Sequence, residues 1–386
     1  MSMRPDAMPR ASRLRLALLC ALLPAAQPAL SASHGSAFIS VPASRPVSDA
    51  GPERTTDTDE PDTLDTVRVS GHRNDPAESI EQARRRLGER AGATAVVDAE
   101  RYRDGRVSTL TDALGFAPGV FVQPRFGAEE ARLSIRGSGL QRTFHGRGLQ
   151  LLQDGSPLNL ADGGFDFQAV EPLATRYIAV YRGPSALEYG AATLGGAIDF
   201  VAPTGRDAAP VQLRAEGGSF GYLRSQIALA SAGEAADGYL SATGFVQEGD
   251  RDHAEQETYR LFANGGYRFG ETLSVRGYLT HVDTRSALPG SLTFAEFARD
   301  PRLAAPGNIA LDQRRDFRLD RVAATLRWTP DDRRDLRVSG YYADKSLDHP
   351  IFQVLRQESQ DYGVDLRYRH EGRLGGLRSV LVAGLS

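Results

Sequence analysis

Apolar and polar residues alternate along a series of segments in the second half of the chain, from residue 211 onward. The pattern is clearest in residues 211–216, 273–280, 321–328 and 336–342, where polar or charged residues stand between apolar ones. Because successive side chains of a strand point to opposite faces, these segments predict strands with one apolar and one polar face. A β-barrel with lipid outside and a wet lumen fits this pattern, and so does a soluble β-sandwich.

The spacing of these segments favours the barrel. The expected strands are longer than is usual in a sandwich, and short turns at residues 217–219 and 329–332 alternate with longer loops such as residues 286–316. Short turns at one end and long loops at the other are typical of transmembrane barrels. We expect about nine such strands before the last residue, Ser386.

Composition narrows the classes of protein that remain. No stretch after the N-terminus approaches the run of about twenty apolar residues that a membrane helix needs. The single cysteine excludes an intrachain disulfide. A net charge of −3 argues against a nucleic-acid partner. The basic residues are arginines apart from Lys345, and the planar guanidinium suits recognition of carboxylates and other anions.

The N-terminus has the pattern of a secretory signal peptide. Several arginines precede an apolar run over residues 16–23, and small residues with proline follow it. This pattern predicts a signal peptide over residues 1–33 with cleavage near Ser31 or Ser33, and a buried N-terminal helix is the alternative. Residues 34–61 are rich in Ser, Pro, Asp and Thr and are expected to form a disordered arm.

A glycine-punctuated segment over residues 133–201 separates this arm from the alternating region. Short apolar runs predict strands at residues 149–153, 177–181 and 197–201, and Asp154-Gly155 supplies turn chemistry after the first of them. Upstream we expect a helix over residues 77–90, a strand at 95–97, a helix over 109–116 with Ser108 as its N-cap, and a strand at 120–123. Together these elements predict a compact α+β domain over residues 76–207.

Several short motifs follow one another in this domain. They are Pro118-Gly119-Val120, Ser134-Ile135-Arg136-Gly137, Leu152-Gln153-Asp154-Gly155, Val180-Tyr181-Arg182-Gly183-Pro184 and Gly195-Gly196-Ala197-Ile198. In this order they resemble the plug domain of TonB-dependent outer-membrane receptors, most of all the ferric citrate and siderophore transporter group. The resemblance implies an α+β plug domain followed by an antiparallel transmembrane β-barrel. Barrels of that family have about twenty-two strands, so residues 208–386, with about nine, are expected to be the first part of a truncated barrel.

The same resemblance implies a function. Such a receptor imports a ferric chelate, here ferric citrate or a siderophore, across the bacterial outer membrane with energy delivered by TonB. Outer-membrane lipid surrounds the barrel, the Fe(III) chelate is cargo rather than a cofactor, and no enzymatic activity is expected. A receptor for cobalamin, heme or a nickel chelate is an alternative, and so is a plugged barrel without energy coupling.

Residues 62–75 resemble the region of the TonB box. The strand-like residues Asp65, Thr66, Val67, Arg68, Val69 and Ser70 would pair with a sheet edge of the TonB C-terminal domain. A first strand of the plug is the alternative interpretation of this segment.

The ligand of such a receptor is expected at the plug loops that face the outer mouth. Candidate ligand-binding residues are Gln123, Arg125, Arg142, Phe144, Arg147 and Asn159, which offer guanidinium, amide and aromatic groups to an anionic chelate. For each arginine, pairing with a carboxylate of the barrel wall is an equally good interpretation. Arg136 and Arg182, within the shared motifs, are expected to be such wall anchors.

No catalytic or metal-binding pattern is convincing. Residues 217–221 fit a nucleophile elbow around Ser219, but that motif needs a strand-to-helix turn. Here the glycines lie between two expected strands and predict a hairpin. The seven histidines are scattered without metal-ligand spacing, so no metal site is expected.

Overall fold

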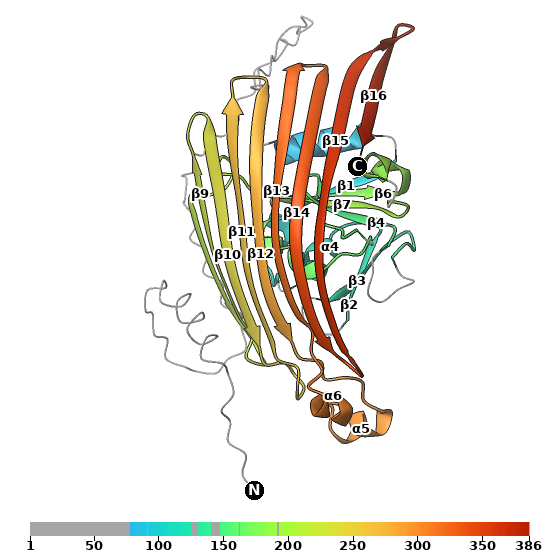
Figure 1. Cartoon of the computed structure of the whole chain (residues 1–386), viewed down its shortest axis with the longest axis vertical. Helices are drawn as coiled ribbons and strands as arrows, with labels where there is room; N and C mark the ends of the chain where they lie inside the picture. Colours follow the sequence, from blue (N-terminus) through green and yellow to red (C-terminus); the bar gives the residue numbers. More distant parts are fainter. Residues whose placement is uncertain are drawn as a thin grey trace, which may run out of the picture.

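The computed structural model describes residues 78–90, 92–107, 109–125, 130–139, 147–161, 163–190 and 193–385. Within these ranges the chain forms a mixed α/β plug up to residue 201 and a wall of long strands that lies along one side of it (Figure 1). The expected signal peptide, residues 65–70 and the candidates Arg142 and Phe144 lie outside the described residues.

The wall is a nine-stranded antiparallel sheet in which each strand pairs with its neighbours in the sequence. Its strands are β8 (Val211–Gly217), β9 (Leu223–Ala232), β10 (Ala236–Gln247), β11 (Gln256–Phe269), β12 (Leu273–Ser286), β13 (Asp316–Asp331), β14 (Arg334–Pro350), β15 (Val354–Leu374) and β16 (Leu377–Leu385). Sequential hairpins of this kind build the wall of an up-and-down barrel. The expected antiparallel sheet after the plug is confirmed.

The two faces of the wall differ in polarity. On β13, Arg321 and Thr325 are 5% and 8% exposed, whereas the neighbouring Val322 and Leu326 are 51% and 37% exposed. The polar face packs on the plug and the apolar face points away from it (Figure 1). A sandwich would bury its apolar face, so the sandwich alternative is excluded. A lipid-facing barrel wall requires the arrangement that is found.

Connection lengths distinguish the two ends of the wall. At one end, which we call the short-turn end, strands are joined by residues 233–235, 270–272, 332–333 and 375–376. At the opposite, long-loop end, residues 287–315 form the longest connection and carry α5 (Phe294–Arg299) and α6 (Pro306–Ala310) (Figure 1). The predicted asymmetry is found for the turn near residue 332 and the loop 287–315. The turn predicted at residues 217–219 was wrongly grouped with the short-turn end, because the β8–β9 connection lies at the long-loop end.

The plug is built on a five-stranded sheet with the strand order β1-β6-β7-β4-β5. Its strands are β1 (Ala93–Asp98), β4 (Leu149–Gln153), β5 (Ser156–Pro157), β6 (Tyr177–Arg182) and β7 (Gly196–Val201). Strands β4 and β7 are parallel, and the other neighbours are antiparallel. A separate hairpin pairs β2 (Val120–Pro124) with β3 (Ala131–Ile135).

Short helices complete the plug and close its apolar core. They are α2 (Ile80–Gly88), α3 (Glu100–Arg103), α4 (Leu110–Leu114) and the 3-10 segments η1 (Phe167–Ala169), η2 (Pro172–Ala174) and η3 (Gly183–Tyr189). The main core cluster contains Leu114, Ile135 and Ile178, and a second cluster joins Leu87 of α2 to Tyr181 of β6. Among the described residues, no helix has the length and apolar character needed to cross a membrane.

Two predicted helix starts are corrected by their caps. Helix α2 begins at Ile80, because the Ser79 hydroxyl accepts the Gln82 backbone N–H at 3.1 Å and the Gln82 side chain accepts the Ser79 N–H at 2.8 Å. Helix α4 has Thr109 rather than Ser108 as its N-cap, because the Asp112 carboxylate accepts the Thr109 backbone N–H at 3.0 Å. Both starts are capping boxes, in which two backbone donors at the helix end are satisfied reciprocally.

Candidate functional site

Of the plug strands, those of the β2–β3 hairpin lie nearest to the long-loop end of the wall (Figure 1). Gln123 on β2 is exposed, and Arg125, which follows β2, is half-buried. The Arg125 backbone N–H donates to the Glu130 carbonyl at 2.9 Å and extends the pairing of the two strands. Two of the predicted ligand-binding residues therefore lie together at this end of the plug.

Two further arginines gather around Arg125. Burial lowers the pKa of Arg125, and the nearby positive charges of Arg132 on β3 and Arg315 at the edge of the wall lower it further, against the opposing effect of Glu130. The Nε of Arg132 is buried and has no hydrogen-bond partner among the described residues. Arg125 and Arg132 of the hairpin and Arg315 beside it thus place three guanidinium groups close together, which suits an anionic ligand.

A carboxylate cluster joins this end of the plug to the wall. Asp166 accepts hydrogen bonds from Arg315 at 2.7 Å and from Lys345 of β14 at 2.6 Å, and Arg315 also pairs with Glu130 at 2.8 Å. Burial alone would raise the pKa of Asp166, but Lys345 and Arg315 hold it below its usual range. The only lysine of the chain is therefore used to fix the plug.

Asn159 does not have the role that we expected of it. It is 7% exposed, and its amide is used by the backbone of the plug. Its Oδ1 accepts the Leu151 N–H at 2.8 Å, and its Nδ2 donates to the carbonyls of Leu149 at 2.9 Å and Gly163 at 3.0 Å. Because these bonds shape the turn after β4, Asn159 supports the plug rather than presenting an amide to a ligand.

The two arginines of the shared motifs also differ from the expectation. Arg182 donates to backbone carbonyls of the plug, Ala93 at 3.2 Å, Thr94 at 2.9 Å and Pro118, instead of pairing with a wall carboxylate. Arg136 is exposed and lies against Gly183, where a Cβ would stand 2.6 Å from its Nη1. Arg182 therefore holds plug segments to one another, and Arg136 packs against the plug rather than against a wall carboxylate. Arg147 is exposed in the turn before β4.

The deepest link between plug and wall is an ion pair that the sequence analysis missed. Glu171, which precedes η2, contacts Arg224 of β9 at 2.5 Å and Arg260 of β11 at 3.5 Å, and all three side chains are at most 5% exposed. Burial by itself would raise the pKa of Glu171, yet Arg224 and Arg260 hold it below its usual range. Arg224 also donates to the Val107 carbonyl, so it binds two separate plug segments.

Further wall side chains reach β5 and the loop that follows it. Arg321 of β13 donates to the Ser156 hydroxyl at 2.8 Å and to the Pro157 carbonyl at 2.9 Å. Asp361 of β15 accepts the Ala161 N–H at 2.9 Å. The sequence could have indicated these contacts. An arginine or aspartate at a strand position whose side chain points to the plug is buried there and needs a hydrogen-bond partner.

The residues around Ser219 form a strand-to-strand turn and not the strand-to-helix turn of a nucleophile elbow. Residues 218–222 form the turn between β8 and β9, closed by the Gly218 N–H donating to the Tyr222 carbonyl at 2.9 Å, so the predicted hairpin is confirmed. Among the described residues, no group of three or more His, Cys, Asp or Glu side chains could hold a metal ion.

Comparison with known proteins gives the class of the plug. Residues 86–197 match the family model of the TonB-dependent Receptor Plug Domain. This segment, which includes the hairpin, the Asp166 cluster and Glu171, is a TonB-dependent receptor plug domain.

Individual relatives agree with this class. The chain is 32% identical over 112 residues to a ferrioxamine receptor of Yersinia enterocolitica, covering 28% of this chain and 15% of the relative. It is 25% identical over 205 residues to the vitamin B12 transporter BtuB of Vibrio vulnificus, covering 53% and 27% of the two chains. Both are receptors or transporters by name, in line with the expectation that the chain is not an enzyme.

A solved structure extends the likeness to the wall. The unliganded ferric citrate transporter FecA superposes with a TM-score of 0.64 at 19% identity, over 78% of this chain and 48% of that one. The described residues therefore have the fold of a plug followed by wall strands of such a barrel. The chain spans about half the length of this structure, and still less of the two curated relatives.

Proposed function

We propose that the protein is an outer-membrane receptor for TonB-coupled import of an anionic ferric chelate, ferric citrate or a siderophore. The observation that carries the proposal is the plug packed on the polar face of a wall whose other face is apolar. The hairpin with Arg125 and Arg132 lies toward the long-loop end (Figure 1). A wall of this polarity suits a bilayer, and a plug within it suits gated passage rather than free diffusion.

Charge at the hairpin supports an anionic cargo. Arg125, Arg132 and Arg315 lie close together, and the two carboxylates described beside them, Glu130 and Asp166, are both engaged by Arg315. Guanidinium forks bind carboxylates through paired, charge-assisted hydrogen bonds. A ferric chelate with free or metal-bound carboxylates therefore matches this surface better than a neutral one. Relatives named for ferric citrate and for ferrioxamine support iron as the transported metal.

The coupling part of the proposal comes from the sequence. After cleavage of a signal peptide over residues 1–33, residues 62–75 would extend from the plug into the periplasm. Residues 65–70 would pair as a strand with the TonB C-terminal domain, and the pull would act on the plug through α2, the first described helix. The wall anchors at Glu171 and Asp166 would resist that pull.

Growth and uptake measurements test the proposal. Iron-starved cells that carry the gene are supplied with ferric citrate, with ferric siderophores or with cyanocobalamin, in strains with and without TonB. We expect growth on one ferric chelate that requires both the gene and TonB. Growth equally good without the gene would refute import by this protein, and dependence on the gene but not on TonB would favour a plugged barrel without coupling.

Cobalamin is the second candidate cargo, because the vitamin B12 transporter BtuB aligns with 53% of the chain. The cyanocobalamin arm of the growth assay decides between the two cargoes. A requirement of the gene for cyanocobalamin use, with none for any ferric chelate, would replace iron by cobalamin in the proposal.

A further inference from the structure

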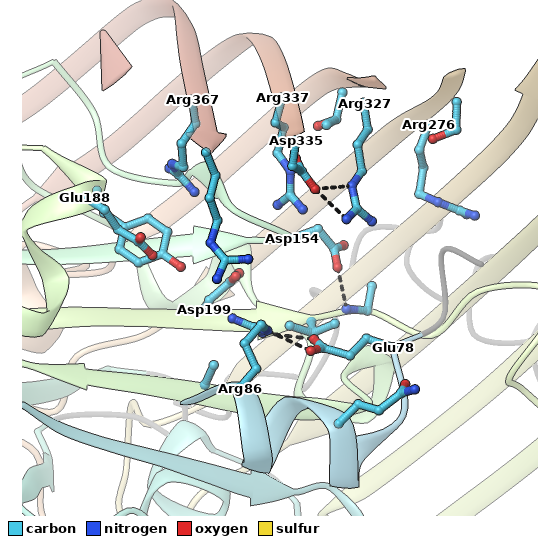
Figure 2. A pocket seen from close by; sticks show the side chains of 18 of the residues that line it. Glu78, Arg86, Asp154, Glu188, Asp199, Arg276, Arg327, Asp335, Arg337 and Arg367 are labelled. Carbon is cyan, nitrogen blue, oxygen red and sulfur yellow. Dashed lines mark hydrogen bonds and ion pairs between the residues drawn. The ribbon is translucent and has the colours of Figure 1, made fainter. Parts of the chain in front are cut away.

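A large cavity lies between plug and wall at the short-turn end, opposite to the hairpin. Its volume is about 1300 Å³. The plug contributes residues of α2, β6, η3 and β7 to its lining, and the wall contributes residues of β10 to β16. Figure 2 shows arginines of the wall strands reaching into it toward Asp154 and Asp199 of the plug.

The lining is unusually rich in arginine. Ten arginines and seven carboxylates line it, and neither lysine nor histidine is present in the lining. Three further carboxylates just outside the lining, Asp207, Asp365 and Glu371, pair with four of the arginines. The arginines are Arg86, Arg90, Arg176, Arg268, Arg276, Arg327, Arg337, Arg367, Arg369 and Arg378. Low-dielectric walls on both sides strengthen the attraction between an anion and any guanidinium donors that these carboxylates leave unused.

Many of these arginines already share a carboxylate. Arg86 pairs with Glu78 at 2.7 Å, Arg276 with Asp237 at 2.8 Å and Arg327 with Asp335 at 2.5 Å. Each such guanidinium keeps further N–H donors that a second anion can use, because it offers five donors in a fixed fork. The pairs therefore place the arginines without using up their capacity to bind.

Arg337 of β14 is the member best placed for an added ligand. Its side chain is half-buried and makes no hydrogen bond or ion pair with any residue in the described ranges. Its Nη1 reaches the Asp154-Gly155 turn, where it lies 3.1 Å from the position that a Cβ on Gly155 would occupy. Arg367 of β15 stands beside it, with its guanidinium 4.5 Å from the centre of the Tyr189 ring.

Asp154 and Asp199 of the plug cancel less of the positive charge of these arginines than two fully ionised, inward-facing carboxylates would. Asp154 accepts the Ala202 N–H at 3.1 Å, and Asp199 accepts the Gly155 N–H at 3.0 Å, so both are turned toward the backbone of the plug. Burial, together with the charge of Asp199, raises the pKa of Asp154 to about 7. Burial also raises the pKa of Asp199. Around neutral pH part of this negative charge is absent, which leaves the guanidinium groups in excess.

We propose that this cavity is an inner anion-binding station, which holds a carboxylate- or phosphate-bearing solute between plug and wall at the short-turn end. The inference rests on the proposed function, because it gives an anionic chelate a second site on the inner side of the plug. Binding there is weaker than at the hairpin, since most of the arginines are shared with carboxylates. Weak binding suits a site that must release its ligand to the periplasm.

Equilibrium dialysis of the purified protein, as its gene encodes it, tests this site with radiolabelled citrate and with inorganic phosphate. The variants are Arg337→Gln in the cavity and Arg333→Gln, an exposed arginine in the neighbouring β13–β14 turn, as the matched charge control. We expect a weak class of citrate sites whose Kd rises about tenfold in Arg337→Gln, the loss of one charge-assisted interaction. Arg333→Gln should bind like the unmodified protein, and Arg337→Lys should recover part of the affinity.

Equal binding by the Arg337→Gln and Arg333→Gln proteins would overturn the inner station, as would a single class of sites. Circular dichroism of each variant checks that the wall still folds. The same dialysis separates this inference from the proposed function. If the cavity binds phosphate and citrate but cells import no ferric chelate, the proposed function fails and the inner site stands. If cells import a ferric chelate but the purified protein has no weak class of sites, the inner site fails and the proposed function stands.

Discussion

Glu171 of the plug and Arg224 of the wall form an ion pair of 2.5 Å in which both side chains are at most 4% exposed. Arg260, on the next strand but one, contacts the other oxygen of the same carboxylate at 3.5 Å. Burying these charges is costly, and the cost is offset only while all the partners stay in place. The pair therefore fixes one side of the plug to β9 and β11 and defines where the plug is held most firmly.

Glu171→Gln should destabilise the protein strongly. The variant keeps the shape of the side chain but removes the negative charge that compensates two buried guanidinium groups, and breaking such a pair costs about 3–5 kcal/mol. Urea unfolding in detergent, with protease cleavage of the plug as a second readout, measures the loss. Asp320→Asn is the control, since Asp320 pairs with His281 at 2.6 Å but is 46% exposed, and it should cost less than about 1 kcal/mol. Similar losses in the two variants would show that the buried pair is not a main anchor.

Asp154 predicts a pH dependence of stability. Its pKa is raised to about 7 by burial and by Asp199, against the opposing charges of Arg276 and Arg176. The folded protein therefore binds more protons than the unfolded chain between about pH 4 and 7, so this group makes stability fall as the pH rises through that window. Asp154→Asn should flatten the dependence and be more stable than the unmodified protein at pH 8. Asparagine keeps an acceptor for the Ala202 N–H and tolerates the φ of 50° at this position.

Thermal unfolding of the two proteins between pH 5 and 8 checks this expectation. Parallel curves for Asp154→Asn and the unmodified protein would mean that Asp154 is ionised throughout and that its burial has no such effect.

Arg125→Gln should weaken binding of ferric citrate at the hairpin. Removing one guanidinium from the group formed with Arg132 and Arg315 takes away a charge-assisted contact, which predicts an affinity roughly tenfold lower. The difference should shrink with added salt, because the hairpin is partly open to solvent. Titration of ferric citrate at two salt concentrations measures this effect, with Arg333→Gln at the opposite end as the charge-matched control. An unchanged affinity would remove Arg125 from the ligand site.

Gly196→Ala should prevent the plug from folding. At φ 151°, a Cβ on Gly196 would stand 2.2 Å from the Tyr181 carbonyl oxygen of β6, and neither strand of this central pair can move aside. Gly137→Ala is the comparison, because its φ of 86° is also unfavourable but the space around it is open, so only the conformational cost of about 1 kcal/mol applies. Protease resistance of the two variants separates a clash from a conformational cost. Equal resistance would contradict the close approach at Gly196.

Much of the fold could be predicted because local chemistry sets it. Strand β4 begins and ends where its apolar run and the Asp154-Gly155 turn indicate, and both turn residues have positive φ, 50° and 78°. The wall strands follow from alternation, and the exposed Val322 beside the buried Arg321 is the same pattern in three dimensions.

The links between plug and wall could not be predicted in the same way. Glu171 and Arg224 are 53 residues apart, and their contact depends on how the wall passes round the plug. Asn159 and Arg182 have side chains that suit a ligand or a wall anchor, yet nearby backbone carbonyls and N–H groups claim them first. Sequence alone does not reveal which polar partner lies closest in space.

The central claim is that import is coupled to energy from TonB. The most direct test deletes residues 65–70 from the gene and measures how fast the cells take up radioactive ferric citrate. Binding of the chelate to the cell surface is measured alongside, so that a protein that fails to reach the membrane is recognised. The account predicts that surface binding persists while uptake falls to the level of cells without TonB. Uptake at the undiminished rate after the deletion would contradict it.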